Sequence, residues 1–340
     1  MYIVLFAVLC IAKSLALDCD TIQDADIYDN NTINLPKIVG PLPSKFNCTY
    51  QIKAPANSTY GFSAHVSVEN FLKGANDYAL IIDVDGTTTR INNRTTGSPF
   101  VYNIIPGAQI SIQLVTKSVV MNSEFLIEVT YHEAIMPTVK KMATGGVMNF
   151  FDLNTLSDGK HYFNGITYTG NEQIQAYLAA FSDKKFTGCW DCYVMDGTVE
   201  KHSKIYRIAM FEDPTFASTF NAITVFAATE KTLKMVFNPL SEARQFSSLW
   251  ATESKMSVSI YASPANTQAI EVVNFNSTGI TLEDLYINSE ICIAYIESGP
   301  PNIASRRLLD LSSNPNIPYF FNEKYFTVVI KNCFLEFRMK

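Results

Sequence analysis

The sequence has little charge and only a small excess of acidic residues. Charged residues make up 17% of the 340 residues, and 26 Lys+Arg against 32 Asp+Glu give a formal net charge of -6. A chain with 47% hydrophobic residues and so little charge is too apolar to be disordered, and its acidic balance disfavours binding to nucleic acid. The composition is that of a globular protein long enough for about two domains.

Long hydrophobic runs are also missing. The apolar run from Tyr2 to Ala12 is shorter than the ~20 residues that a membrane-spanning helix needs, and no later run approaches that length. Ser14-Leu15-Ala16 follows, which places small residues where a signal peptidase requires them. We therefore predict a signal peptide over residues 1–16, with a buried N-terminal strand as the alternative. The mature chain is expected to be secreted and to have no membrane span.

Cysteines and Asn-x-Ser/Thr sequons agree with an oxidising, extracellular compartment. Cys10 belongs to the expected leader, which leaves an even number of cysteines. These fall into two groups, so each half is expected to close its own disulfides: Cys19 and Cys48, then Cys189, Cys192, Cys292 and Cys333. The sequons predict N-glycans. They lie at Asn30, Asn47, Asn57, Asn93 and Asn276.

The spacing of the cysteines suggests how they pair. Cys48 is in phase with the apolar positions of its predicted strand, so its sulfur points into a core, and we predict a bond to Cys19. For the later four, we favour bonds that join Cys189 and Cys192 to Cys292 and Cys333, because an extended Cys-x-x-Cys needs a tight turn to bond internally. A redox pair and a four-cysteine zinc site are the less favoured alternatives.

Alternation of apolar and polar residues dominates the first half of the chain. Short alternating segments recur about every ten residues with turn residues between them, which is typical of an antiparallel β-sandwich or barrel. The pattern stops after Tyr131. We predict a first domain over residues 17–134, a linker over 135–147 and a second, mostly-β domain over 148–340. Within the second domain, Asn171 to Phe181 fits a helix and a strand about equally well.

Part of the first half resembles the central strands of CUB domains. The resemblance rests on Phe62 to Glu69 (FSAHVSVE), Asn76 to Ile82 (NDYALII) and the Asp85-Gly86 turn. With Cys19 and Cys48 ahead of them and the closing strand Glu128 to Tyr131 behind, residues 17–134 resemble the CUB-like family of secreted nematode proteins. The resemblance implies an all-β jelly-roll sandwich, used for extracellular binding in innate immune or stress responses, with no catalytic activity.

The second half carries a weak echo of the same segment. Cys189 to Gly197, including Trp190, parallels Asn76 to Gly86. The second domain is therefore either a diverged copy enlarged by insertions or a separate β domain.

The resemblance also raises the question of calcium. Many CUB domains hold a calcium ion with a Glu, an Asp eight residues later and an Asp in a late hairpin. Glu69 and Asp77 have the required spacing, but Lys117 occupies the third position. An ammonium group near a divalent cation is unfavourable, so Glu69 and Asp77 are only weak calcium candidates. We predict no metal and no cofactor.

Hydrolase signatures are missing as well. The sequence has no G-x-S-x-G, and His132-Glu133 lacks the second histidine of a zinc-protease helix. The histidines are expected at the surface, with a meeting of histidine and serine in space as the alternative: His65, His132, His161 and His202. Trp190 is a weak binding candidate, because we favour its packing in a core beside a disulfide over an outward position.

These features together predict a secreted, glycosylated, non-catalytic recognition or effector protein. Its expected partner is an extracellular protein or carbohydrate, and not a nucleic acid. A structural or matrix protein is the alternative, and a secreted enzyme is the least favoured interpretation.

Overall fold

The computed structural model describes residues 19–340 with short gaps, and almost all of its elements are strands. The gaps are residues 38–39, 58, 119–121, 144, 153–158, 181–188, 212–214, 229–233, 276–278, 289–290 and 303–304. The predicted signal peptide and the sequon at Asn276 lie outside the described residues. The helical elements described are η1 (Asp24–Asp26), η3 (Ile208–Met210) and α1 (Leu240–Ala243). The prediction of an all-β fold is confirmed.

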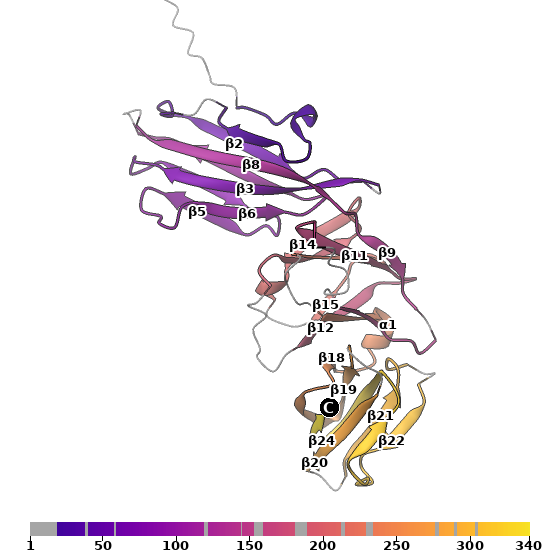
Figure 1. Cartoon of the computed structure of the whole chain (residues 1–340). Coiled ribbons are helices and arrows are strands. Elements are labelled where there is room, and N and C mark those ends of the chain that lie inside the picture. Colours follow the sequence, from indigo (N-terminus) through magenta and orange to yellow (C-terminus); the bar gives the residue numbers. More distant parts are fainter. Residues whose placement is uncertain are drawn as a thin grey trace, which may run out of the picture.

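Two antiparallel four-stranded sheets form a sandwich at the N-terminal end (Figure 1). The first sheet has the order β1 (Thr32–Leu35), β8 (Glu124–Ala134), β3 (Gly61–Phe71), β6 (Phe100–Ile104). The second has the order β2 (Asn47–Lys53), β7 (Gln109–Val115), β4 (Tyr78–Ile82), β5 (Thr88–Asn92).

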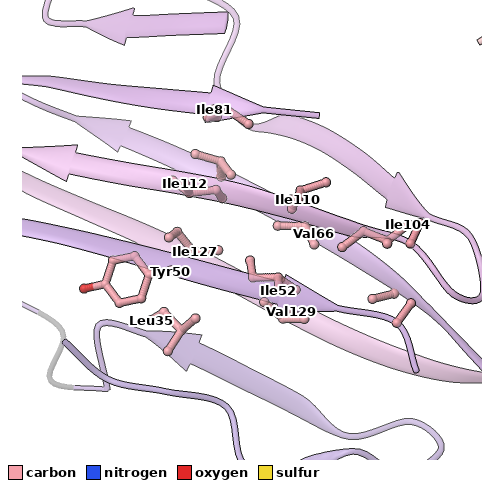
Figure 2. Close-up of a cluster of buried hydrophobic side chains, with 14 of the residues drawn as sticks. Leu35, Tyr50, Ile52, Val66, Ile81, Ile104, Ile110, Ile112, Ile127 and Val129 are labelled. Atoms are coloured by element: carbon pink, nitrogen blue, oxygen red, sulfur yellow. The ribbon is translucent and has the colours of Figure 1, made fainter. Parts of the chain in front are cut away.

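The core of this sandwich follows from the alternation in its strands. Along β2, exposed and buried residues alternate strictly, so that Tyr50 and Ile52 point inward. Figure 2 shows these side chains meeting Val66 of β3 and Val129 of β8 from the opposite sheet. Burying large apolar side chains on both inner faces supplies most of the favourable free energy of such a sandwich.

The remaining strands form a five-stranded and an eleven-stranded sheet. The five-stranded sheet has the order β14 (His202–Arg207), β13 (Cys192–Gly197), β16 (Ala222–Ala228), β11 (Phe163–Thr169), β9 (Thr138–Lys141). The main path of the larger sheet is β10 (Asn149–Asp152), β17 (Lys234–Pro239), β12 (Ile174–Ala180), β18 (Ser248–Glu253), β19 (Ser257–Val273), β24 (Tyr325–Met339), β20 (Ile280–Ile287), β23 (Tyr319–Phe321). Its side branches are β15 (Thr215–Ala217), β21 (Ile293–Ser298) and β22 (Arg307–Asp310).

The molecule is elongated, and its apolar cores follow one another along its length (Figure 1). One core fills the space between the five-stranded sheet and strands β10, β12 and β17, and another lies among the C-terminal strands. Phe163, Tyr193 and Phe226 of the five-stranded sheet belong to the same cluster as the core of the N-terminal sandwich. The sandwich therefore packs directly on the rest of the chain. Strand β9, which lies inside the predicted linker, pairs in parallel with β11.

The ambiguous segment near residue 175 is a strand. β12 (Ile174–Ala180) pairs with β17 along one edge and with β15 and β18 along the other. Ala176, Tyr177 and Leu178 are all buried, because both faces of this central strand are covered. Burial on two faces removes the alternation of a strand and produces apolar spacings that imitate a helix.

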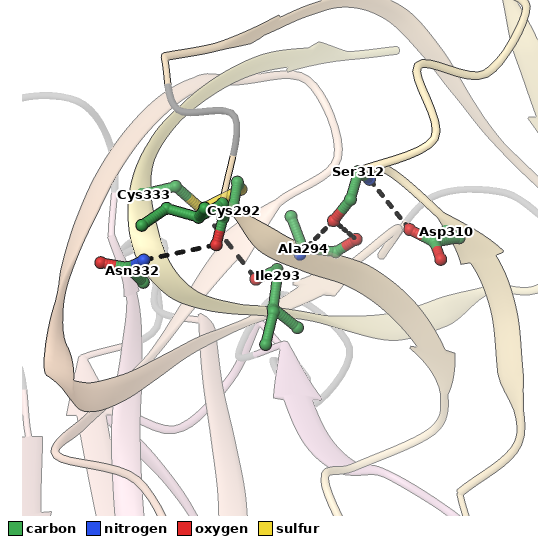
Figure 3. The surroundings of a disulfide bond; sticks show 8 residues. Cys292, Ile293, Ala294, Asp310, Ser312, Asn332 and Cys333 are labelled. Carbon is green, nitrogen blue, oxygen red and sulfur yellow. Dashed lines mark hydrogen bonds between the residues drawn. A yellow bond between two sulfur atoms is a disulfide. The ribbon is translucent and has the colours of Figure 1, made fainter.

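The disulfides differ from one of the predicted pairings. Cys19 is bonded to Cys48, but Cys189 is bonded to Cys192, and Cys292 to Cys333. The favoured links between the two later pairs are therefore wrong. Residues 190–191 form the tight turn that an internal Cys-x-x-Cys bond requires. The two pairs also lie in different cores, and Figure 3 shows Cys292 and Cys333 meeting beside Ile293 of β21 and Asn332 of β24.

Candidate ligand-binding cleft

A cleft of about 760 Å³ lies between the outer face of the first sheet and the second part of the chain. One wall comes from β3, β6, β8 and the turn before β1, and the other from the segment ahead of β11 and the turn ahead of β13. The polar side chains that line it are Asp29, Asn30, Ser63, His65, Asn103, His132, Glu133, Lys160, His161, Tyr162 and Asp191. Small or apolar residues such as Gly159, Phe163 and Ala228 lie between these groups, so the cleft offers both polar and apolar surface to a ligand.

The pairing of the strands places several of these side chains next to one another. His65 on β3 is in register with Asn103 on β6, and Ser63 is in register with His132 on β8. Alternate residues of a strand point to one face, so the even-numbered neighbours Ala64 and Val66 enter the core while His65 faces outward. The same alternation that builds the core thus builds one wall of the cleft.

A chain of hydrogen bonds crosses the cleft from one wall to the other. Nδ1 of His65 lies 2.9 Å from Oδ1 of Asn103, and Nδ2 of Asn103 donates to the hydroxyl of Tyr162 at 3.2 Å. The Tyr162 hydroxyl in turn donates to Oδ2 of Asp191 at 2.9 Å. Four polar side chains from four separate parts of the sequence are fixed by one another. Such a network holds its members in place before any ligand arrives.

The rim of the cleft is held by Asp29. Its Oδ1 accepts the backbone N–H of Glu133 at 2.9 Å, and its Oδ2 accepts Nδ2 of Asn30 at 2.7 Å. The backbone N–H of Asn30 donates to the carbonyl of Tyr131 at 2.8 Å. Asn30 has a left-handed backbone with φ of 59°, which asparagine tolerates better than most residues. These bonds fasten the turn before β1 to the edge of β8.

The histidines and the serine of the cleft do not form a serine–histidine pair in the contacts that Ser63 makes. Three of the four histidines line the cleft, and His202 lies on β14 away from it. The hydroxyl of Ser63 donates to the backbone carbonyl of His132 at 3.5 Å, so its proton is not directed at an imidazole. Within the described part of the chain, no three His, Cys, Asp or Glu side chains are grouped so that they could hold a metal ion.

Sequence reasoning missed most of this cleft. Asn103 and Tyr162 are 59 residues apart, and neither belongs to a recognisable motif. The sequence does contain one signal for the cleft. His65 and Asn103 alternate with apolar residues in their strands, so they are expected on the face of the sheet that points away from the core. The partners on the opposite wall follow a turn or precede a strand, and no local pattern marks them.

Comparison with known proteins identifies the first part of the chain. Residues 17–134 match the CUB-like domain family. This part of the chain is a CUB-like domain. None of the curated proteins compared with the chain matches it. A CUB-like domain and disulfide bonds are features of an extracellular protein of the binding type. Among the described residues, no helix has the length and apolar character needed to span a bilayer.

Solved structures show only distant likenesses. The CUB1-EGF-CUB2 domain of human MASP-1/3 is 10% identical, with a TM-score of 0.23 over 61% of this chain and 98% of that chain. The CUB1-EGF-CUB2 domains of rat MASP-1 are 10% identical, with a TM-score of 0.23 over 62% and 98%. The triple jelly roll fold of an archaeal virus turret is 10% identical, with a TM-score of 0.21 over 92% and 89%. TM-scores this low do not establish a shared architecture.

Beside the cleft, a buried ion pair ties the CUB-like domain to the five-stranded sheet. The guanidinium of Arg207 on β14 donates to Asp83 at 2.6 Å and to Asp85 at 3.2 Å, in the turn between β4 and β5. All three side chains are at most 10% exposed. Burial raises the pKa of the Asp83 carboxyl, and the attraction of Arg207 offsets only part of this rise. The turn that suggested the CUB resemblance is thus a contact point between the two parts.

The position of Trp190 contradicts the favoured prediction that it packs in a core. Its side chain is 56% exposed, and the guanidinium of Arg207 lies 5.0 Å from its ring centroid. The Cys189–Cys192 bond closes the turn that carries Trp190, so the flanking cysteines are buried while the tryptophan points outward. An exposed aromatic ring next to Asp191 extends the surface around the cleft.

The two weak calcium candidates, Glu69 and Asp77, belong to no group of three or more His, Cys, Asp or Glu side chains among the described residues. Asp77 is buried, and its carboxylate accepts the backbone N–H of Lys117 at 2.7 Å and of Ser118 at 2.9 Å. It also accepts the hydroxyls of Ser118 and Ser123 at 2.6 and 2.7 Å. Burial alone would raise the pKa of Asp77, but these bonds lower it below its ordinary value. The backbone N–H groups and hydroxyls around Asp77 therefore stabilise its charged form by hydrogen bonds, while Glu69 is half-buried on β3.

The described sequons lie at accessible places on the CUB-like domain. Asn30, Asn47 and Asn93 are exposed, and Asn57 is half-buried. Asn47 alternates with the buried Cys48 on β2, as predicted from the phase of that strand. Asn30 is the described sequon that also lines the cleft.

Proposed function

We propose that this protein is a secreted, glycosylated recognition protein that binds an extracellular ligand in the cleft and acts without catalysis. The observation that carries the proposal is the hydrogen-bonded row His65, Asn103, Tyr162, Asp191 across the cleft. Preorganised polar groups in a concave site between two parts of a chain are the usual setting for a ligand. The signal peptide over residues 1–16, the N-glycans and a role in innate immune or stress responses belong to the same proposal.

The absence of catalysis is supported by how the polar groups are used. The Ser63 hydroxyl is occupied by a carbonyl, and His65 is oriented by an amide in place of a carboxylate. A nucleophile needs a base within hydrogen-bond reach, and the base needs a group that orients it for proton transfer. The contacts of Ser63 and His65 fit recognition better than acyl transfer.

A matched pair of variants tests the proposed site. His65 is exposed at the mouth of the cleft, so His65→Trp fills the opening without disturbing a core. Lys331→Trp adds the same bulk at an exposed position of β24, outside the cleft. We expect the wild-type protein and Lys331→Trp to bind the surface of microbial cells or a purified extracellular protein, and His65→Trp to lose most of that binding. Equal binding by all three proteins would contradict the cleft as the site.

Solubility separates recognition from a matrix role. A recognition protein is expected to elute from a sizing column as a free monomer or small oligomer. Recovery only as an insoluble or crosslinked material would contradict the proposal.

A further inference from the structure

Tyr162 presents an aromatic ring to the cleft in a fixed orientation. The ring is 46% exposed, although its hydroxyl is held from both sides by Asn103 and Asp191. The buried ring of Phe163 contacts it edge-to-face, with 4.8 Å between centroids and an interplanar angle of 89°. A ring that is already immobilised loses little conformational entropy when a ligand packs on it.

The charges around this ring disfavour an anionic ligand. Asp29, Glu133 and Asp191 bring three carboxylates to the cleft, and among the described lining residues Lys160 is the one permanently cationic group. The whole chain is acidic as well, with a formal charge of -6. A ligand with carboxylate, sulfate or phosphate groups would meet repulsion here, whereas a neutral or amine-bearing ligand would not.

The hydrogen-bonding groups of the cleft suit a ligand rich in hydroxyls. Carboxylates accept hydrogen bonds, the amides of Asn30 and Asn103 both donate and accept, and imidazoles can do either. A sugar ring carries neighbouring hydroxyls that donate and accept together, and one apolar face of C–H groups that can pack on an aromatic ring. The volume of about 760 Å³ lies in the range of small-molecule sites.

From this combination we propose that the cleft binds a neutral or amine-bearing oligosaccharide, with one sugar ring stacked on Tyr162. The proposal rests on the proposed recognition function and names its ligand class. The carboxylates of Asp29 and Asp191 receive hydroxyl or ammonium protons of the sugar, and Asn103 holds the tyrosine in position.

Three tyrosine variants and a glycan array test this assignment. Tyr162→Ala removes the ring, and Tyr162→Phe keeps the ring but removes both bonds of the hydroxyl. Tyr286→Ala is the matched control, because Tyr286 is 55% exposed on β20 and does not line the cleft. The secreted full-length proteins are applied to an array of neutral, amine-bearing, sialylated and sulfated oligosaccharides. Melting temperatures of all variants are measured to verify folding.

We expect the wild-type protein and Tyr286→Ala to bind neutral or amine-bearing glycans and to ignore the sialylated and sulfated ones. Tyr162→Ala should bind those glycans at least roughly tenfold more weakly than the wild-type protein, and the affinity of Tyr162→Phe should lie between those of the two. Binding only to anionic glycans, no binding to any glycan, or equal binding by folded Tyr162→Ala would overturn the proposal. If no glycan binds while His65→Trp still abolishes binding to an extracellular protein, the ligand class is wrong and the recognition site stands.

Discussion

The Nη2 atom of Arg207 lies 2.6 Å from Oδ2 of Asp83, and this pair joins two parts of the chain that are 124 residues apart. Asp83 belongs to the β4–β5 turn of the CUB-like domain, and Arg207 ends β14 of the five-stranded sheet. The two walls of the cleft come from these same two parts. A buried ion pair of this kind therefore helps to set the spacing of the cleft.

Replacing Arg207 should destabilise the protein strongly. Arg207→Ala leaves Asp83 and Asp85 buried without a cation, which typically costs about 3–5 kcal/mol. Arg306→Ala is the control, because Arg306 is 78% exposed and its pair with Glu323 spans 3.9 Å, so its loss should cost less than about 1 kcal/mol. Urea unfolding of both variants measures the difference. Equal stabilities would show that the pair does not hold the two parts together.

Asp77 should support the structure without calcium. Asp77→Ala removes the acceptor of four hydrogen bonds and should destabilise the protein by about 1–3 kcal/mol, while Glu69→Ala should have little effect. Calcium in the millimolar range, added after chelation, should leave the melting temperature unchanged. A rise of several degrees that both substitutions abolish would instead establish a metal site at Glu69 and Asp77.

Glu271 should make the wild-type protein less stable in mild alkali. It is fully buried on β19, and burial raises its pKa to about 8, although a bond from Asn238 opposes the rise. The unfolded chain ionises this carboxyl near its ordinary value of 4.5, so stability is lost as the pH rises from about 4.5 to about 8. Glu271→Gln should therefore melt about 2–5 °C higher than wild type at pH 8 and close to it at pH 4.5.

The exposed Glu336 of β24 provides the control for this pH dependence. Glu336→Gln should show no such change between the two pH values. A melting temperature of Glu271→Gln that stays level with wild type at pH 8 would mean that Glu271 is not held neutral in the folded protein.

A glycan on Asn30 should narrow the cleft, because Asn30 lines it. Thr32→Ala removes this sequon and keeps the asparagine that the left-handed backbone favours. Thr95→Ala removes the sequon of Asn93, which does not line the cleft. We expect Thr32→Ala to bind ligand several-fold more tightly than wild type, and Thr95→Ala to bind equally. Mass spectrometry establishes which asparagines carry a glycan, and unchanged binding after loss of an Asn30 glycan would refute this expectation.

The fold could be predicted where burial follows a simple period. In β2 and β8 one face is covered and the other meets solvent, so alternation reveals the strands and the inward phase of Cys48. In β12 both faces are covered, and the alternation that would distinguish a strand from a helix disappears. The local sequence could not resolve that case, because the neighbours that cover β12 come from distant segments.

The cleft could be predicted only in part, for a related reason. The outward phase of His65 is visible in the sequence, but its use depends on Tyr162 and Asp191, which tertiary packing brings to the opposite wall. The prediction that Trp190 packs in a core was wrong for another reason. Proximity to cysteines suggests burial, whereas the Cys189–Cys192 bond closes a turn, and the side chain of Trp190 points outward from that turn. The periodicity of a sequence predicts neither which distant segments pack together nor the geometry of a turn.

Chemical footprinting of the histidines tests the cleft most directly. Diethyl pyrocarbonate modifies accessible imidazoles, and peptide mass spectrometry reads each histidine separately with and without saturating ligand from the array or the surface-binding assay. We predict that ligand protects His65, His132 and His161, which line the cleft, and leaves His202 on β14 unchanged as an internal control. Two results would contradict the assignment of the cleft as the binding site. One is protection of His202 alone, and the other is labelling of all four histidines that is the same with and without ligand.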